Sequence, residues 1–167
     1  LDSPEPVRAY STLGGRAPAH CVATGKVLLA YGDSPLPGAE HGTLSGFTPR
    51  TLTTRARLQE ALADIRARGY AVNWGEWRDR VRGVAAPIRD ARGQVVASIG
   101  ISGPAERLTR ARIAEVTPCV VAAAQEVSIA LGGGGFTTGE AGGRGPRAAA
   151  RPGAMGKRAD EGQARSE

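Results

Sequence analysis

The chain has 167 residues, a net charge of +6 and two cysteines. Two cysteines in a chain of this length exclude a disulfide scaffold, and the absence of a run of about 18 apolar residues argues against a membrane protein. No charged-then-apolar signal peptide opens the sequence, so we expect a cytoplasmic protein without membrane contact. Nearly all the cations are arginines that alternate with acids, as in residues 59–68, which indicates a solvated basic surface rather than a nucleic-acid-binding face.

Residues 132–167 differ in composition from the rest of the chain. They hold 11 of the 24 glycines and one aromatic residue, and they contain no Ile, Leu or Val. Such a segment cannot bury enough apolar surface to offset the entropy lost on ordering. We therefore expect one folded domain, residues 1–131, followed by a disordered tail rich in Gly and Arg, residues 132–167.

In the first half of the domain, the sequence predicts one short strand and then two helices. Val7–Ser11 is strand-like, and a helix is expected from Thr24, as its N-cap, to Tyr31. Pro and Gly interrupt residues 32–50, which indicates a loop.

A second, amphipathic helix follows that loop. Thr53 or Thr54 is expected to be its N-cap, and Gly69 stands where a glycine commonly ends a helix. The apolar face of this helix is predicted to consist of Leu58, Ala61, Leu62 and Ile65.

After the second helix, the sequence predicts β-structure. Tyr70–Trp74 is β-prone, and Val81–Arg89 and Gln94–Ser102 are predicted to be two strands joined by a hairpin turn at residues 90–93. Alternation along the last strand places four side chains on one face: Val95, Ala97, Ile99 and Ile101.

The last predicted element is a helix that Thr109 caps and that ends near Leu131. Pro118 lies within it and is expected to kink or divide it. Cys119 lies beside the apolar stripe and is expected to be a small core residue. The element order, β-α-α-β-β-β-α, predicts an α+β fold with an antiparallel sheet.

No motif for catalysis, cofactor binding or metal binding is complete. The glycine run at residues 132–135 lacks the final glycines of a dinucleotide-binding loop and follows no strand. Cys21 and Cys119 lack metal-ligand spacing. Adjacent residues on an extended segment point to opposite faces, so His20 and Cys21 are not expected to form a reactive pair. We therefore expect no catalytic residue, no metal and no cofactor.

Six segments in order carry a resemblance to a known family. The first, GRAPAHCVATGKVLLA, is similar to the pattern GR-x-x-P-x-H-x-x-A-x-GK-x-L-L-A. The full set is Gly15–Ala30, Phe47–Thr53, Arg68–Asn73, Gly75–Trp77, Gly83–Asp90 and Ile99–Thr109. Together they resemble the C-terminal effector-binding domain of IclR-type bacterial transcription regulators, over residues 4–132.

The resemblance implies a GAF/PAS-like α+β domain, an antiparallel sheet flanked by helices. In the family this domain follows an N-terminal winged helix-turn-helix domain, and the proteins act as dimers or tetramers on operator DNA. The chain has no winged-helix segment and begins at a point that resembles the middle of the effector domain. We therefore expect a partial effector domain, with DNA contacted only through the absent winged-helix part of a full-length protein.

The resemblance also implies a pocket for a small organic acid that biases assembly and operator binding. The corresponding positions are Ala23, Thr24, Gly25, Asn73, Gly83, Gly100 and Ser102. A helix N-terminus at Ala23–Gly25 would offer free N–H groups to a carboxylate. Two plainer interpretations stay open: Gly25 permits helix packing, and Ser102 is a turn residue.

Three polar positions of the family pocket are altered in this sequence. Asn73 stands in place of a common Asp, Gly83 in place of a Cys found in many members, and Gly100 in place of the first of two serines. Because two of these positions lose their side chains, the pocket is expected to be roomier and less polar.

Three of the seven aromatic residues lie within eight positions of one another, at Tyr70, Trp74 and Trp77. As pocket walls they favour an aromatic or longer-chain carboxylate effector, whereas Trp77 is equally consistent with plain core packing. Two alternative functions remain: a partner-dependent or non-functional fragment, and an enzyme acting on small carboxylic acids, for which no general base is evident.

Overall fold

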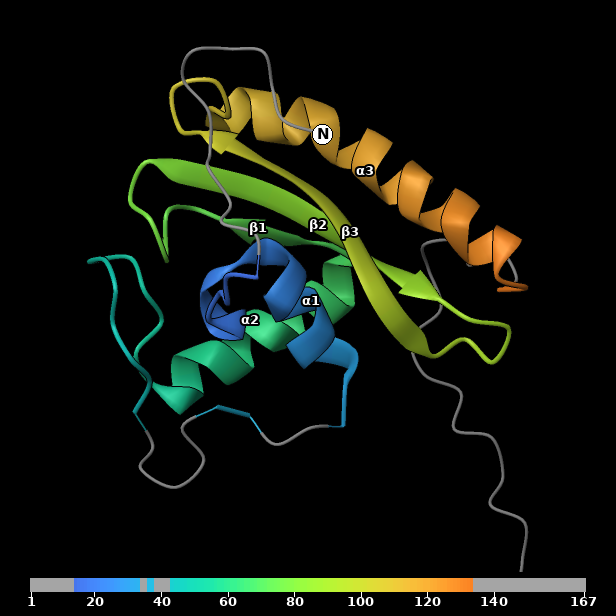
Figure 1. Cartoon of the computed structure of the whole chain (residues 1–167), viewed down its shortest axis with the longest axis horizontal. Coiled ribbons are helices and arrows are strands. Elements are labelled where there is room, and N and C mark those ends of the chain that lie inside the picture. Colours follow the sequence, from blue (N-terminus) through green and yellow to red (C-terminus); the bar gives the residue numbers. More distant parts are fainter. Residues whose placement is uncertain (1–13, 34–35, 38–42, 134–167) are drawn as a thin grey trace, which may run out of the picture.

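A computed structural model describes residues 14–33, 36–37 and 43–133 (Figure 1). The elements, in chain order, are the 3₁₀ turn η1 (Ala19–Cys21), α1 (Ala23–Tyr31), α2 (Arg55–Arg68), β1 (Ala71–Asn73), β2 (Val81–Arg89), β3 (Val95–Pro104) and α3 (Arg110–Ala130). This is the expected α+β fold. The strand expected at Val7–Ser11 and the tail from residue 134 onward lie outside the described residues.

The three strands form one antiparallel sheet in the order β1-β2-β3. The predicted hairpin is present, since β2 pairs with β3 along its whole length. The register shifts near its turn: Ile88 pairs with Ala97, but Arg89 pairs with Val95. Such a bulge moves the following side chains to the other face of a strand. The prediction that Val95 shares a face with Ala97 is therefore wrong, and Val95 packs on the α1 side of the sheet.

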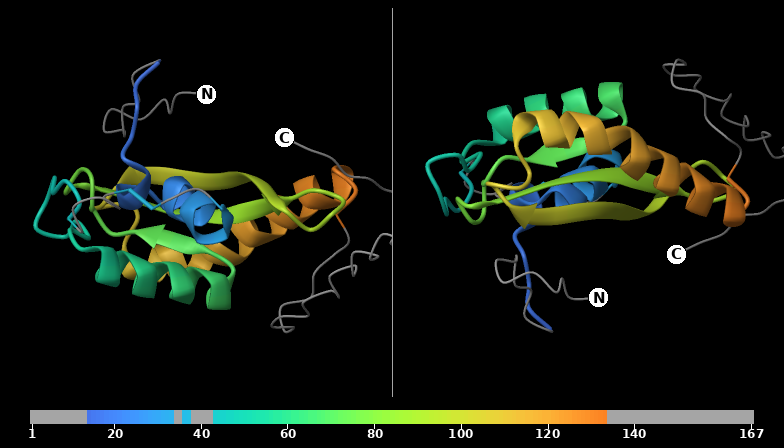
Figure 2. Two further views of the ribbon diagram at one scale, coloured as in Figure 1. Left: turned by 90° about the horizontal axis from the view of Figure 1, so that it is seen from below. Right: turned by 90° about the horizontal axis from the view of Figure 1, so that it is seen from above.

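Helices cover both faces of the sheet, α1 and α2 on one side and α3 on the other (Figures 1 and 2). Alternation along β2 creates this division, because Ala85 faces the α1 side while Val84 and Ala86 face α3. The core of the α1 side consists of Ala23, Val27, Ala30, Leu44, Leu58, Leu62, Ile65, Ala71 and Ala85. The core of the α3 side consists of Val84, Ala86, Ile88, Ile113, Val120 and Ala124.

The two longer helices begin at predicted capping residues. The Thr54 hydroxyl accepts from the Arg57 backbone N–H at 3.4 Å, and the Thr109 hydroxyl accepts from the Arg112 backbone N–H at 3.2 Å. Gly69 ends α2 in the left-handed conformation, with φ of 78°, which costs a glycine no steric strain.

The start of α1 differs from the prediction. The N-cap is Val22, and Thr24 lies within the first turn. The preceding residues turn as a short 3₁₀ segment, so His20 and Cys21 are not on an extended strand. This turn folds back against α1, a tertiary contact that the local sequence pattern does not reveal.

Helix α3 is continuous, so Pro118 does not divide it. Cys119 is exposed, and its prediction as a core residue is wrong. By length and composition α3 could cross a membrane, with a mean hydropathy of 1.3 over its most apolar window. A core helix passes the same test, and this one packs on the sheet through Ile113, Val120 and Ala124.

Candidate ligand-binding cavity

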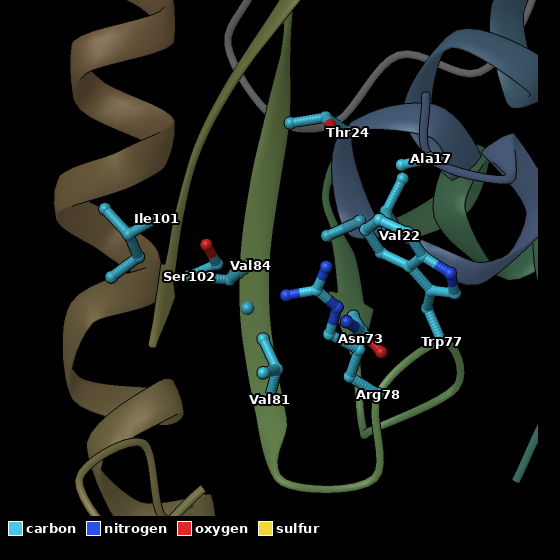
Figure 3. A pocket seen from close by; sticks show the side chains of 12 residues that line it. Ala17, Val22, Thr24, Asn73, Trp77, Arg78, Val81, Val84, Ile101 and Ser102 are labelled. Atoms are coloured by element: carbon cyan, nitrogen blue, oxygen red, sulfur yellow. The ribbon is translucent and has the colours of Figure 1, made fainter. Parts of the chain in front are cut away.

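A cavity of about 220 Å³ opens where the start of α1, the loop between β1 and β2, and the paired ends of β2 and β3 meet (Figure 3). It is lined by Ala17, Val22, Ala23, Thr24, Asn73, Trp77, Arg78, Val81, Gly83, Val84, Ile101 and Ser102. Six of the ten residues that the sequence singled out are among them: Ala23, Thr24, Asn73, Trp77, Gly83 and Ser102. The fold thus brings together three segments that are far apart in the sequence.

Two of the three aromatic residues lie elsewhere. Tyr70 and Trp74 pack against the core on the α3 side of the sheet. The Trp74 ring lies beside two guanidinium groups, with the Cζ atoms of Arg110 and Arg82 at 5.0 and 5.7 Å from its centroid. Of the three aromatic residues, Trp77 alone lines the cavity.

The glycines at the predicted site make close backbone approaches. A Cβ atom on Gly25 would lie 2.4 Å from the Ala19 carbonyl oxygen, so Gly25 allows η1 to pack on α1. A Cβ atom on Gly83 would lie 2.6 Å from the Ile101 oxygen. One on Gly100, which does not line the cavity, would lie 2.6 Å from the Val84 oxygen. At each of these three positions the absence of a side chain allows a close backbone approach, and Gly83 also lines the cavity.

Asn73 is buried, and its orientation follows from its hydrogen bonds. Its Oδ1 atom accepts from the backbone N–H groups of Gly75 and Glu76, both at 2.9 Å. Since backbone N–H groups only donate, the carboxamide oxygen must face this turn. The two N–H donors of the carboxamide are therefore left for the cavity side. An aspartate at this position would offer only acceptors there.

The start of α1 supplies further donors. The Val22 N-cap has no side-chain hydrogen bond, and the first turn contains no acidic residue. The first N–H groups of a helix have no partner within it, and they carry partial positive charge. Ala23 and Thr24 bring this end of α1 to the cavity wall.

Arg78 is a lining residue that the sequence analysis missed. It is exposed at the cavity, and its Cζ atom lies 4.6 Å from the centroid of the Trp77 ring. An arginine next to a tryptophan was a signal in the sequence, but arginines are too frequent in this chain for one to stand out.

A buried ion pair holds the loop that carries Trp77 and Arg78. Lys26 Nζ of α1 lies 2.6 and 2.7 Å from the two carboxylate oxygens of Glu76, and it donates to the Val72 carbonyl oxygen at 2.8 Å. Burial raises the pKa of Glu76, and the charge of Lys26 opposes that rise.

A second set of contacts anchors the same loop from the opposite side. The Thr48 hydroxyl donates to the Gly75 carbonyl oxygen at 2.8 Å, and the Thr51 hydroxyl donates to the Glu76 carbonyl oxygen at 2.6 Å. The loop is therefore fixed to α1 and to residues 48–51, which makes it a preformed wall of the cavity.

The described part of the chain shows no arrangement for catalysis. Burial raises the pKa of the Cys21 thiol to about 11, which makes it a poor nucleophile at neutral pH. The His20 ring is buried, and its Nε2 atom lies 3.1 Å from the Ser45 carbonyl oxygen. Among the described residues, no three His, Cys, Asp or Glu side chains are grouped to hold a metal ion.

Comparison with known proteins identifies the domain. The family model for the C-terminal domain of the bacterial transcriptional regulator IclR matches residues 1–129. The chain belongs to the IclR family. It is 39% identical over 130 residues to the HTH-type transcriptional regulator BhcR of Paracoccus denitrificans, covering 76% of this chain and 46% of that protein. The chain spans about half the length of the curated relatives it matches.

Solved structures of IclR-type domains share the fold. The C-terminal domain of the Escherichia coli regulator KdgR matches with a TM-score of 0.62 and 32% identity, covering 71% of this chain and 73% of that domain. A double mutant of the inducer-binding domain of PobR from Acinetobacter, in complex with 3-hydroxybenzoic acid, matches with a TM-score of 0.63 and 28% identity, covering 69% of this chain and 67% of that one. These relatives are transcription regulators, and this chain carries the effector-binding domain of one.

Proposed function

We propose that the cavity binds a small organic acid as the effector of a bacterial transcription regulator. The observation that carries the proposal is the polar character of the lining: it offers the Asn73 carboxamide donors and the N-terminus of α1, and it contains no acidic side chain among its described residues. Donors without competing carboxylates favour an anion. The complex of the related PobR domain with 3-hydroxybenzoic acid supports an acid of this kind.

The size of the cavity narrows the class of acid. Its volume of about 220 Å³ lies below the roughly 300–1,000 Å³ typical of sites for drug-sized ligands. Val22, Val81, Val84 and Ile101 supply apolar walls. We therefore favour a compact acid with an apolar body, such as a single-ring aromatic acid or a short aliphatic acid, over a two-carbon acid.

Calorimetric titration of the 167-residue chain tests this proposal. We expect 3-hydroxybenzoate and aliphatic acids longer than pyruvate to bind more tightly than glyoxylate or pyruvate, because only the larger acids reach the apolar walls of the cavity. Tighter binding of glyoxylate would contradict the proposed size class, and no binding by any of these acids would contradict the proposed function.

The Asn73→Asp variant tests the anion site itself. It keeps an oxygen for the Gly75 and Glu76 N–H groups but replaces the two donors on the cavity side with an acceptor. We expect weaker acid binding with little loss of stability. Gln125→Glu adds the same charge on the exposed face of α3 and should leave binding unchanged. Equal affinities for the Asn73→Asp variant and the unmodified chain would contradict the role given to Asn73.

In the full-length regulator, we propose that the acid acts by favouring one homo-oligomer over another, a dimer or a tetramer, and that DNA is bound through a winged-helix domain in the cytoplasm. An effector needs a differential affinity of about 1–3 kcal/mol between two states to shift such an equilibrium usefully. Sedimentation velocity with and without acid checks this step, and an unchanged distribution would contradict it.

A second candidate is a domain that needs a partner to fold. Within the described residues β3 pairs on one side only, and it exposes Val96 and Ile101 by 53% and 42%. An open edge with apolar side chains favours pairing with further chain. A cooperative thermal unfolding transition of the isolated chain would exclude this candidate.

A further inference from the structure

We infer that the outward face of α3 is an interface with a second copy of this chain, packed antiparallel about a two-fold axis near Cys119. The outward face is the side of α3 opposite to the sheet, and its residues are Arg112, Glu115, Cys119, Ala122, Glu126 and Ile129. This inference adds an interface to the homo-oligomer proposed above, and it needs no ligand in the cavity.

The spacing of these six residues places them in one stripe along the helix. They recur at intervals of three and four positions, the period of one face of an α-helix, and each of them is exposed. The buried residues of α3 follow the same period on the side that packs on the sheet. The right view of Figure 2 shows α3 on the outside of the molecule, with no other described helix or strand over its outward face.

Helix α3 is apolar on more sides than the sheet covers. Its most apolar window is hydrophobic enough to cross a membrane, yet only 22% of that window is buried. Residues 116–125 include no charged side chain, and Ile129 is 58% exposed. An apolar helix surface that extends beyond the buried stripe favours a further packing partner.

Charge complementarity indicates that this partner is a second copy. Arg112 precedes the uncharged residues 116–125 and Glu126 follows them, each seven positions from Cys119, or about two helical turns. A two-fold axis at Cys119 therefore places Arg112 of each copy beside Glu126 of the other. Arg112 also pairs with Glu115 of its own helix, so its guanidinium group would lie between two carboxylates. A parallel arrangement would instead bring like charges together.

The middle of the outward face suits the close approach of two helices. Cys119 and Ala122 have small side chains, which allow a short distance between the helix axes at the crossing point. One patch then serves both copies, as a two-fold interface requires. Because the contact consists of one helix face from each copy, we expect weak association that increases with protein concentration.

The first test uses the native thiol of Cys119 as a reporter. Cys119 is exposed and Cys21 is buried, so mild oxidation of the 167-residue chain with copper–phenanthroline should link Cys119 of two copies. A non-reducing gel measures the linked dimer, and Cys119→Ser should remove it. The control is Cys119→Ser/Ala111→Cys, which moves the thiol to an exposed position one turn before Glu115. An antiparallel partner carries that position at the far end of its helix, so this control should form little dimer.

The second test exchanges the charges at the two ends of the face. Glu126→Arg should weaken self-association in sedimentation velocity by about fivefold or more, because it removes an exposed ion pair and adds a repulsion. Arg112→Glu/Glu126→Arg should restore the association. Glu60→Arg makes the same change of charge on the exposed side of α2 and should leave it unchanged. Since these side chains are exposed, all variants should keep the melting temperature of the unmodified chain at low protein concentration.

Three results would overturn the inference. Equal dimer yields from the unmodified chain and the Ala111→Cys control would indicate random collision. Equal association of Glu126→Arg and the unmodified chain would contradict the pairing of charges. A chain that stays monomeric at millimolar concentration but floats with phosphatidylcholine vesicles would assign the face to a membrane. Each of these results leaves the proposed binding of acids in place, because calorimetry measures that binding separately.

Discussion

The two faces of the sheet bury different kinds of groups. On the α1 side, the buried polar residues are His20, Lys26, Thr51, Asn73 and Glu76. On the α3 side they are Thr117 and Ser128, whose hydroxyls donate to carbonyl oxygens of their own helix at 2.6 and 2.7 Å. The α3 side is held together by apolar packing, whereas the α1 side links α1 to the loop between β1 and β2 through charged and polar groups.

The difference shows what each face does for the cavity. A buried charge is unfavourable unless it is paired, and even a paired one stabilises little compared with apolar packing. A fold that buries Lys26 and Glu76 together therefore gains a defined position for the loop more than it gains stability. That loop carries Trp77 and Arg78 and directly follows Asn73, the last residue of β1, so the polar face is the one that shapes the ligand site.

The largest expected effect comes from separating the buried pair. Lys26→Met leaves Glu76 buried without its partner, which should lower the free energy of unfolding by about 3–5 kcal/mol. The exposed pair of Arg112 and Glu115 on α3 offers the matched control, and Arg112→Met should leave the free energy of unfolding nearly unchanged, because water and salt screen an exposed pair. Urea unfolding measures both. Equal losses would contradict the contrast between the two faces.

The loss in Lys26→Met should also depend on pH. Burial already raises the pKa of Glu76 above its ordinary value of 4.5, and removing Lys26 removes a charge that lowers it. The folded variant then binds a proton that the unfolded chain does not, so its stability rises as the pH falls toward 4.5. The deficit relative to the unmodified chain should therefore shrink as the pH falls from neutral toward 4.5. The double variant Lys26→Met/Glu76→Gln should lose this dependence.

A smaller effect is expected where η1 meets α1. Gly25→Ala would place a Cβ atom 2.4 Å from the Ala19 carbonyl oxygen, so one of the two segments must move. We expect a loss of about 1–3 kcal/mol and weaker acid binding, because the cavity wall shifts with α1. Gly103→Ala is the control, since its nearest neighbour would be a Leu108 methyl at 3.5 Å. Thermal unfolding and calorimetry of the two variants would separate packing at Gly25 from a general glycine effect.

The smallest expected effect is the loss of a helix N-cap, which should lower stability equally on the two sides of the sheet. Thr54→Ala on the α1 side and Thr109→Ala on the α3 side each remove one N-cap hydrogen bond. Each should lower the free energy of unfolding by about 1 kcal/mol, because a cap depends on its own first turn. Clearly unequal losses in urea unfolding would show that these caps also make tertiary contributions.

Several sequence predictions failed where a distant segment decides the outcome. Thr24 has the chemistry of an N-cap, yet the preceding turn packs against α1 and the helix begins at Ala23. Cys119 lies near the apolar stripe, but α3 turns it to the surface. Alternation along its strand predicts that Val95 lies on the same face as Ala97. A register shift in the hairpin moves Val95 to the other face.

The candidate site likewise contains some residues that the sequence located and others whose position only the fold decided. The motif resemblance located Ala23, Thr24, Asn73, Gly83 and Ser102 on the cavity wall, because their segments are recognisable one at a time. Trp77 and Trp74 are three positions apart, and the sequence gives no reason to separate them. The sheet does separate them, since Trp74 packs toward α3 while Trp77 lines the cavity.

The sequence by itself determined the family, the α+β class, the second and third helices with their threonine caps, and the hairpin. These depend on local periodicity, capping and turn chemistry, which act within a few residues. Only the tertiary structure decided that Lys26 meets Glu76, that the Asn73 carboxamide turns its donors to the cavity, and that Arg78 lies there over Trp77. Each of these depends on how α1 and the loop pack together, and no local pattern encodes that packing. The sequence analysis assigns the net positive charge of the chain to a solvated surface. In the fold, one of these arginines, Arg78, lies at the cavity.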